Sequence, residues 1–328
     1  MIPFILRFSS REKYFPVDPI DYIAKCKLVD DNTGEVLHEL GEIRPEDLHR
    51  DKYKSTRLML DPASRSGSQN LEDVPIFHWE NEIIVNQTQK FMDHVYIIFY
   101  SYNGTTEPHD FDAEFVTVRR DHTDQIIGFF LSQHGDAQWV PSKHMLKDES
   151  SGKFVIFVAN ESHANYRTSG TQSRAFGFAS DFTNSGGPIW APERLIYLPR
   201  EPLDLPSNLK YLLFPGKRGV GTGQSFPPYL QQSCRNTLLY TPIPKTQTLI
   251  QGRIKSYDQI AATLKVIAFM TSVGCLINYR EWRVILLTTV SVFLILVLSE
   301  MGELTVIDGA ATKGGIQSKI LQALKKVF

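Results

Sequence analysis

Short apolar runs alternate with polar turns through the first part of the chain. The densest run, VYIIFY at 95–100, contains only β-branched and aromatic residues. It is too short for a lone helix, so we expect a strand that is buried on both faces. Similar runs predict strands at 115–119, 126–133, 153–159 and 194–198. Repeated short strands between Gly, Pro and Asn turns, with few amphipathic helices, predict a mainly β domain, an antiparallel β-sandwich of jelly-roll type.

Two local signals in the amino-terminal part predict a helix and a hairpin. The Pro-rich opening leads into a short helix at 20–25, with Asp18 or Pro19 near its start. The tetrapeptide DNTG at 31–34 predicts a tight turn between two strands. Residues 1–8 are apolar but lack the basic start and the small-residue cleavage site of a signal peptide. We therefore expect them in a buried or edge segment.

Two carboxylates lie beside the core-facing side of the strand at 115–119. Asp112 and Glu114 come just before this strand, and the two-residue period of a strand puts them on the same face as Val116 and Val118. A bare carboxylate beside an apolar face is costly. Both acids must therefore be paired, hydrogen-bonded or bound to a cation.

Three histidines are candidates to join these two acids. His109 lies just upstream, His134 ends the strand at 126–133, and His163 follows the next predicted strand. Acids and imidazoles together make a candidate site for a divalent cation or for acid–base chemistry. The alternative is structural, with the acids bonded to backbone amides or to Arg119 and the histidines as ordinary polar residues at strand ends. Spacing leaves both interpretations open.

These residues resemble a known family. The chain carries, in order, motifs similar to those of the vacuolar protein sorting-associated protein sixty-two-like family: EKYFPVD at 12–18, HDFDAEFVTVR at 109–119, FLSQHG at 130–135 and SHANY at 162–166. The resemblance extends over roughly 8–228. It implies the fold and carries no established chemistry.

The motif at 109–119 is also similar to the heptapeptide of secreted necrosis-inducing toxins, in which a β-sandwich holds a divalent cation at this edge. The sequence departs from that pattern at two positions. Ala113 stands where the family has Trp, and Phe115 stands where it has a second His. The resemblance therefore implies the toxin-like β-sandwich, and the two departures count against metal binding and lytic activity.

Charge and cysteine content exclude two classes of protein. Lys plus Arg number 35 and Asp plus Glu number 36, so the net charge is -1 and no global field favours nucleic acid as a partner. The three cysteines, Cys26, Cys234 and Cys275, are far apart and do not make a disulfide scaffold. A reducing compartment fits this pattern, and one bridge between Cys26 and Cys234 stays open.

The carboxyl-terminal part predicts a membrane anchor. The run at 284–299 carries no charge and approaches the roughly 20 residues that cross hydrocarbon. The run at 260–279 is also mostly apolar, and its one charged residue, Lys265, can snorkel to an interface. The link between the two runs carries residue types found at bilayer surfaces, namely Tyr279, Arg280, Trp282 and Arg283.

We therefore divide the chain into a β-sandwich domain at 1–198, a Pro- and Gly-rich extended arm at 199–255, a transmembrane helical hairpin at 256–301 and an amphipathic tail at 302–328. One span with an interfacial helix and a soluble helical hairpin are the alternatives for 256–301. The tail sets apolar positions against four lysines that suit an anionic membrane surface or a partner helix, Lys313, Lys319, Lys325 and Lys326.

These features predict a membrane-anchored, non-enzymatic adaptor that links a lipid bilayer to other proteins of a large assembly. Two settings fit: a minor capsid protein at the inner membrane of a large membrane-containing DNA virus, and a trafficking factor on the cytoplasmic face of an internal membrane. The alternative is a metal-dependent hydrolase or lytic protein. In that case the two carboxylates hold a divalent cation, and one of the three histidines is the general base.

Overall fold

The computed structural model describes residues 1–86, 89–104, 108–134, 136–172, 180–199 and 204–219. These residues belong to one compact unit of the chain, Met1–Gln172 with Ser180–Gly252. Within them, no helix is long and apolar enough to cross a membrane. The transmembrane hairpin and the amphipathic tail that the sequence predicts lie outside the described residues.

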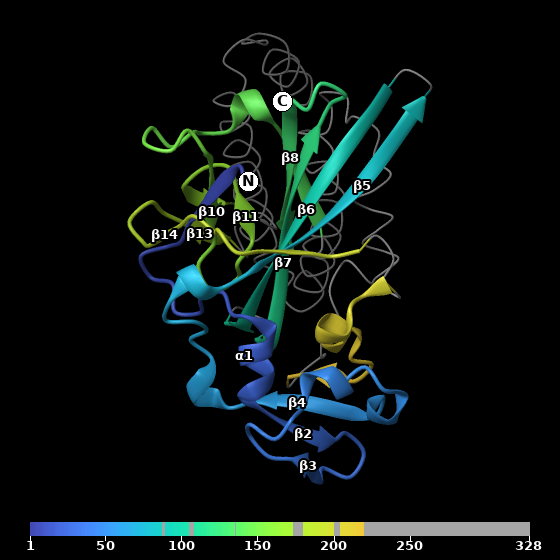
Figure 1. The fold of residues 1–328 in the computed structure, drawn as a ribbon. Helices are drawn as coiled ribbons and strands as arrows, with labels where there is room; N and C mark the ends of the chain where they lie inside the picture. The colour runs from blue at the N-terminus through green and yellow to red at the C-terminus, as the bar shows by residue number, and fades with distance from the viewer. Residues whose placement is uncertain (87–88, 105–107, 135, 173–179, 200–203, 220–328) are drawn as a thin grey trace, which may run out of the picture. The chain divides into compact units, whose positions relative to one another are not determined.

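The described part is mainly β and is built on a six-stranded sheet (Figure 1). Five strands follow one another as an antiparallel meander, and a short sixth strand adds to one edge. In sheet order they are β15 (Leu195–Tyr197), β5 (Ile76–Asn86), β6 (Gln89–Asn103), β7 (His109–Arg120), β8 (Ile126–Gln133) and β9 (Asp136–Pro141). All six residues of the run at 95–100 are buried in β6, which confirms the strand predicted from that run.

A four-stranded sheet covers one face of the six-stranded sheet. Its order is β11 (Asn165–Tyr166), β10 (Phe154–Val158), β1 (Phe4–Arg7) and β14 (Ile189–Trp190). Alternate residues of β1 and β10 share one apolar core with β6, β7 and β8, which includes Phe4, Ile98, Val116, Phe129 and Ile156. The apolar amino-terminal residues therefore form an inner strand of the domain.

A helix, a second four-stranded sheet and a 3-10 helix cover the opposite face. They are α1 (Pro19–Ala24), the sheet of β16 (Lys217–Arg218), β4 (Thr56–Leu60), β2 (Cys26–Asp30) and β3 (Val36–His38), and η8 (Ser207–Leu213). Their apolar side chains form a second core with Phe77, Val95 and Phe99 of the central sheet. The described part of the predicted arm, 204–219, packs into this core through Leu209 and Leu212 and is not an extended cover.

The remaining elements are short. Strand β12 (Gly170–Gln172) pairs with β13 (Asp181–Thr183), and 3-10 turns occupy several connections, namely η1 (Pro45–Asp47), η2 (Asp51–Tyr53), η3 (Pro62–Ser64), η4 (Leu71–Asp73) and η5 (Ser142–His144).

Local sequence signals predicted the first helix and the first hairpin correctly. Helix α1 follows Asp18, whose Oδ1 accepts a hydrogen bond from Ile20 N at 3.0 Å, as expected for an N-cap residue. Strands β2 and β3 pair antiparallel around the DNTG turn. In this turn Asp30 accepts a bond from Thr33 N at 2.9 Å, and Gly34 supplies the left-handed backbone with φ of +76°.

Two expectations about the strands need correction. The sheets are mixed, because β1 pairs with β10, β5 with β15 and β4 with β16 in parallel. Each parallel pair joins segments far apart in sequence, so no tight turn imposes an antiparallel direction. Strand β7 begins at His109, although the sequence predicted this strand only from residue 115. The carboxylates hide the strand pattern, since they are buried with polar partners.

Candidate functional site

The acidic residues of β7 lie where three segments of the chain meet. The pairing of β6 with β7 extends to Asn103 and His109, which places both near Asp112. The loop after β10 brings His163 to the same place. The amino-terminal segment completes the site, because the carbonyl of Tyr14 contacts the His163 ring.

Asp112 has protein donors at both carboxylate oxygens. Asn103 donates to Oδ2 at 2.9 Å, and His163 Nδ1 lies 3.0 Å from the same oxygen. The backbone N of Ala113 donates to Oδ1 at 2.9 Å, and His109 Nε2 lies 3.7 Å from it. Burial raises the pKa of Asp112, but the contacts with His109 and His163 outweigh burial and hold that pKa well below its usual range. The group is therefore a buried, well-bonded carboxylate.

His163 is fully buried against an aromatic ring and between oxygen atoms. Its ring stacks on Tyr100 with centroids 3.8 Å apart and planes inclined by 6°. Nε2 lies 3.0 Å from the carbonyl oxygen of Tyr14 and 3.9 Å from Glu12 Oε1, while Nδ1 faces Asp112. Both ring nitrogens therefore face oxygen atoms of neighbouring segments, and the imidazole joins Asp112 of β7 to the amino-terminal segment.

Glu12 ties the amino-terminal segment to the loop that carries His163. Its Oε1 accepts bonds from Lys13 N at 3.0 Å and Tyr14 N at 2.9 Å, and its Oε2 accepts a bond from Glu161 N at 2.9 Å. Glu161 and His163 have φ of 61° and 58°, in the left-handed region that costs residues other than glycine conformational energy. The buried contacts of Glu12 and His163 hold this strained loop in place.

Glu114 lies on the same face as Asp112, as predicted, but contacts a different partner. The hydroxyl of Ser132 donates to Glu114 and accepts bonds from Phe115 N and Asn165 Nδ2, each at 3.0 Å. Burial and then the charge of Asp112 raise the pKa of Glu114 well above its usual range. A neutral carboxyl group therefore neighbours a charged one on the same strand.

His134 contacts an acid that sequence reasoning missed. Its Nε2 lies 2.6 Å from Oδ2 of Asp181, a buried residue of β13. Tyr166 donates to the same oxygen at 2.5 Å, and Ser162 donates to Oδ1 at 3.0 Å. This second network adjoins the first, because Ser162 and His163 are consecutive residues.

Arg119, the structural partner considered for the acids, forms a fork with Asp93 instead. Nε lies 2.7 Å from Oδ1 and the second guanidinium nitrogen lies 2.8 Å from Oδ2, with both side chains fully buried. The guanidinium also lies over the Phe130 ring, 4.8 Å from its centroid. Asp93 and Arg119 pair in the register of β6 and β7, on the opposite face from Asp112.

The structure does not bring the five predicted site residues together as one group. Two of the histidines contact Asp112, the third contacts Asp181, and Glu114 contacts a serine. As placed, they do not fit a cation held by three of their own side chains. Among the described residues, one group of three metal-binding side chains has all its ligand atoms within 4.8 Å of one another: His78, Glu80 and His94.

Sequence reasoning missed most of the partners that complete these networks. Glu12 and Tyr14 could have been identified from the sequence, because they belong to the EKYFPVD motif that carries the family resemblance. Asp181 follows a stretch rich in Ser, Gly and Thr, and no local pattern links it to His134. Asn103 is the last residue of β6, and no local pattern links it to Asp112.

No protein-family model matches the sequence, and no curated protein matches it. Solved structures of necrosis and ethylene inducing proteins are distantly similar. Necrosis and Ethylene inducing Protein 2 from the causal agent of cocoa's witches' broom disease gives a TM-score of 0.25 at 15% identity, over 51% of this chain and 65% of that one. NLPPya in complex with mannosamine gives 0.37 at 11% identity, over 72% and 86%. A toxin fold for microbial attack and plant defense gives 0.38 at 10% identity, over 74% and 88%.

Proposed function

We propose that the chain is a membrane-anchored, non-enzymatic adaptor that holds other proteins of a large assembly against a lipid bilayer. The observation that carries the proposal is that the acid and imidazole side chains are bonded to other groups of the protein. Asp112 has donors at both oxygens, and His163 is fully buried between its partners. A general base needs a lone pair within reach of a substrate. Groups bonded in this way support the fold rather than a reaction.

The anchor rests on the sequence at 256–301. The uncharged run at 284–299 and the mostly apolar run at 260–279 suit two membrane-spanning helices, with Trp282 and Arg283 at the bilayer surface between them. The lysines of the tail add attraction to an anionic surface. The proposal retains the β-sandwich of jelly-roll type as the part that carries the partner.

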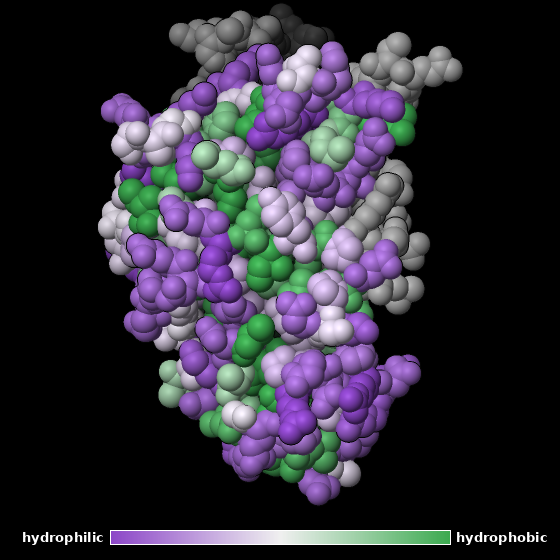
Figure 2. All heavy atoms as spheres, in the orientation of Figure 1, coloured by the Kyte–Doolittle hydropathy of each residue, from purple (hydrophilic) through white to green (hydrophobic). Residues whose placement is uncertain are grey.

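Strand β3 offers a surface for that partner. In the described part of the chain it is the outer strand of the sheet β16-β4-β2-β3. Val36 and Leu37 on β3 are each 41% exposed, and Met59 on β4 is 37% exposed. Figure 2 shows a mostly hydrophilic face on which hydrophobic groups also occur over other parts of the described chain. An edge strand with apolar side chains suits the addition of an extended segment from another protein.

Two settings fit such an adaptor. One is the inner membrane of a large membrane-containing DNA virus, where the chain is a minor capsid protein. The other is the cytoplasmic face of an internal membrane, where the chain is a trafficking factor, as the sorting-associated resemblance implies. Both settings require the same physical property, an integral anchor that carries a folded β domain.

Cell-free synthesis of the full chain with liposomes tests the anchor. The chain should float with the vesicles and resist carbonate extraction. Leu294→Arg should lower the fraction of the chain that resists extraction, because a charge at the centre of one of the two spans costs about 2.5–3.5 kcal/mol on insertion scales. Leu294→Ala, at the same position, should stay with the vesicles. Extraction of the wild-type chain by carbonate would contradict the proposal.

A metal-dependent hydrolase or lytic protein is the second candidate. The observation that favours it is that the pKa values of two neighbouring carboxyl groups shift in opposite directions. The pKa of Asp112 is lowered and that of Glu114 is raised. Such a division assigns base and acid roles in many active sites. Leakage of dye from anionic and neutral vesicles, with and without calcium, magnesium or manganese, tests it. Cation-dependent leakage that Asp112→Asn abolishes would favour this candidate over the adaptor.

A further inference from the structure

Three metal-binding side chains share one face of the β5–β6 hairpin, away from the network around Asp112. His78 and Glu80 are two residues apart on β5, so their side chains point to the same face. In the register of the hairpin, Glu80 pairs with His94 and His78 pairs with Tyr96. Directly paired residues point to the same side of a sheet, and His94 therefore joins the other two.

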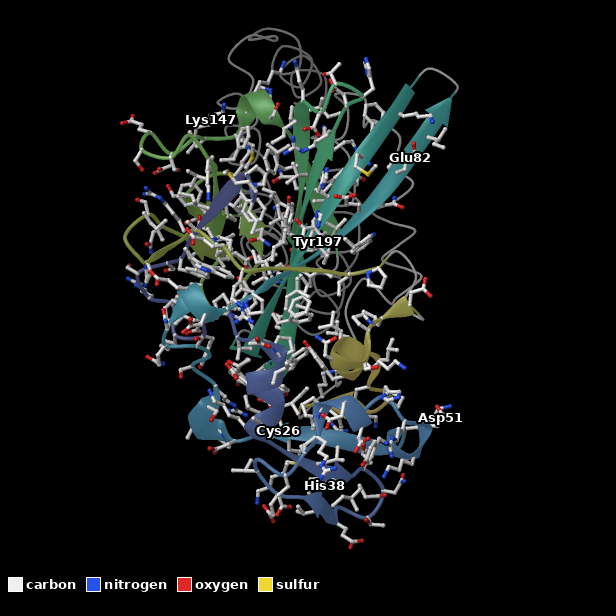
Figure 3. The ribbon with its side chains drawn as sticks, in the orientation of Figure 1. Cys26, His38, Asp51, Glu82, Lys147 and Tyr197 are labelled. Carbon is white, nitrogen blue, oxygen red and sulfur yellow. The ribbon has the colours of Figure 1, made fainter. Side chains whose placement is uncertain are left out.

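Figure 3 helps to locate these residues. It labels Tyr197, which pairs with His78 across β15 and β5, and Glu82, which is two residues beyond Glu80 on β5. The rings of His78 and Tyr197 meet edge to face with centroids 5.3 Å apart. The group thus begins beside β15 and follows β5 toward the end of the hairpin.

The ligand atoms are already close together. His78 Nε2 lies 3.2 Å from His94 Nδ1, and that nitrogen lies 3.4 Å from Glu80 Oε1. All three ligand atoms lie within 4.8 Å of one another. Two nitrogens that bind a tetrahedral zinc ion, each about 2.0–2.1 Å from it, are separated by about 3.4 Å. The distance between the two ring nitrogens is therefore close to that of a zinc site, and the exposed carboxylate lies beside them.

The three residues differ in solvent exposure, which rises from His78 through His94 to Glu80. His78 is 3% exposed, the His94 side chain is 18% exposed and the Glu80 side chain is 53% exposed. The ring nitrogens that face the site are His78 Nε2 and His94 Nδ1. The neutral imidazole is the form that binds a metal.

We propose that His78, Glu80 and His94 form a binding site for a divalent transition-metal ion of the zinc type. Two imidazoles and one carboxylate suit zinc, whereas calcium and magnesium prefer six or more oxygen ligands. Three protein ligands leave a fourth position of the tetrahedron, and the exposed side at Glu80 opens that position to water or to a group from a partner. The site cross-links the two strands of the hairpin and is independent of the adaptor function.

A zinc titration of the full chain, against a chromophoric chelator, tests the site. The wild-type chain should bind one equivalent, and cobalt in place of zinc should give the visible absorption of a tetrahedral site. Glu80→Gln and His94→Gln should each weaken binding by more than the ~10–100-fold that loss of an outer hydrogen-bond partner costs. His122→Gln, which changes an exposed histidine on the β7–β8 turn, should bind as the wild type does.

Two results would overturn the proposal. One is a wild-type chain that binds no zinc in competition with the chelator. In that case the contact between His78 and His94 is only a hydrogen bond between two imidazoles. The other is binding of equal strength in the wild type, Glu80→Gln and His94→Gln, which would place the ion elsewhere. Both variants change partly exposed side chains, and circular dichroism checks that they fold.

Discussion

The ring of His163 lies flat on the ring of Tyr100, with centroids 3.8 Å apart and planes inclined by 6°. This stacking fixes the plane in which His163 reaches Asp112 on one side and the Tyr14 carbonyl on the other. The pair therefore connects the central strand β6, the loop after β10 and the amino-terminal segment. We infer that the imidazole and carboxylate chemistry of this region mainly holds three distant segments together.

Replacing His163 should destabilise the fold strongly. His163→Ala removes the imidazole that lies 3.0 Å from the buried carboxylate of Asp112, and leaving a buried charge without its partner costs about 3–5 kcal/mol. Urea unfolding of the full chain, followed by tryptophan fluorescence, measures the change in free energy of unfolding. His122→Ala removes an exposed imidazole and should stay within about 0.5 kcal/mol. Equal small effects at both positions would show that His163 is not structural.

The raised pKa of Glu114 predicts a stability that falls as pH rises. The folded chain keeps a proton on Glu114 that the unfolded chain releases above pH about 4.3. Between that pH and the pKa in the folded chain, Glu114 should lower the free energy of unfolding by about 1.4 kcal/mol per pH unit. Glu114→Gln mimics the protonated acid and should remove this slope.

Asp112 acts in the opposite direction and in a different pH window. Its lowered pKa stabilises the fold above the unfolded value of about 3.9, and this contribution is lost as pH falls toward the folded pKa. A series of urea unfolding curves from pH 5 upward therefore isolates Glu114, as the difference between the wild type and Glu114→Gln. If the free energy of unfolding depends on pH in the same way in the two proteins, the raised pKa of Glu114 is contradicted.

Removing one member of the buried pair of Asp93 and Arg119 should destabilise the fold strongly, whereas replacing both with apolar residues should destabilise it little. Arg119→Met alone leaves a buried carboxylate, with an expected loss of about 3–5 kcal/mol. Asp93→Leu with Arg119→Met removes both charges and should recover most of that loss, since apolar groups of similar volume often replace a buried pair without cost. Chemical unfolding of the two single variants and the double variant gives the coupling energy. Additive losses would show that the two side chains do not depend on each other.

Two glycines with the same backbone angle provide a matched test of how the amino-terminal segment packs. Gly34 and Gly67 have φ of +76° and +77°. A Cβ at Gly34 meets nothing within 4 Å, whereas a Cβ at Gly67 would lie 2.0 Å from the carbonyl oxygen of Phe15. Gly34→Ala should cost only the left-handed strain of about 1–2 kcal/mol. Gly67→Ala should cost clearly more, because Phe15 must move. Thermal unfolding compares the two, and equal losses would place Phe15 elsewhere.

The elements that the sequence predicted best are those with a local cause. Strand β8 has the predicted bounds, because its apolar run stands between turn residues. Helix α1 begins at Asp18 and Pro19 as their chemistry requires. The parallel pairing of β1 with β10 has no such cause, since it joins Phe4 to Phe154 across most of the domain.

The candidate site was predicted only in part, because its contacts are not local. Asp112 and Glu114 were placed on the correct face by the two-residue period, and His109 and His163 do reach Asp112. The partner of His134 comes from β13, which no pattern marks as a neighbour. The alternation of His78 and Glu80 is visible in the sequence, but His94 joins them only through the strand register. A shift of one residue in that register would turn His94 to the other face.

A titration with magnesium and calcium, followed by thermal unfolding of the full chain and of Asp112→Asn, tests the central claim most directly. The account predicts that the wild-type melting temperature does not respond to these ions, and that Asp112→Asn lowers it equally with and without them. A micromolar binder would instead gain about 4 kcal/mol at millimolar ion. Such a gain, present in the wild type and absent in Asp112→Asn, would contradict a purely structural cluster.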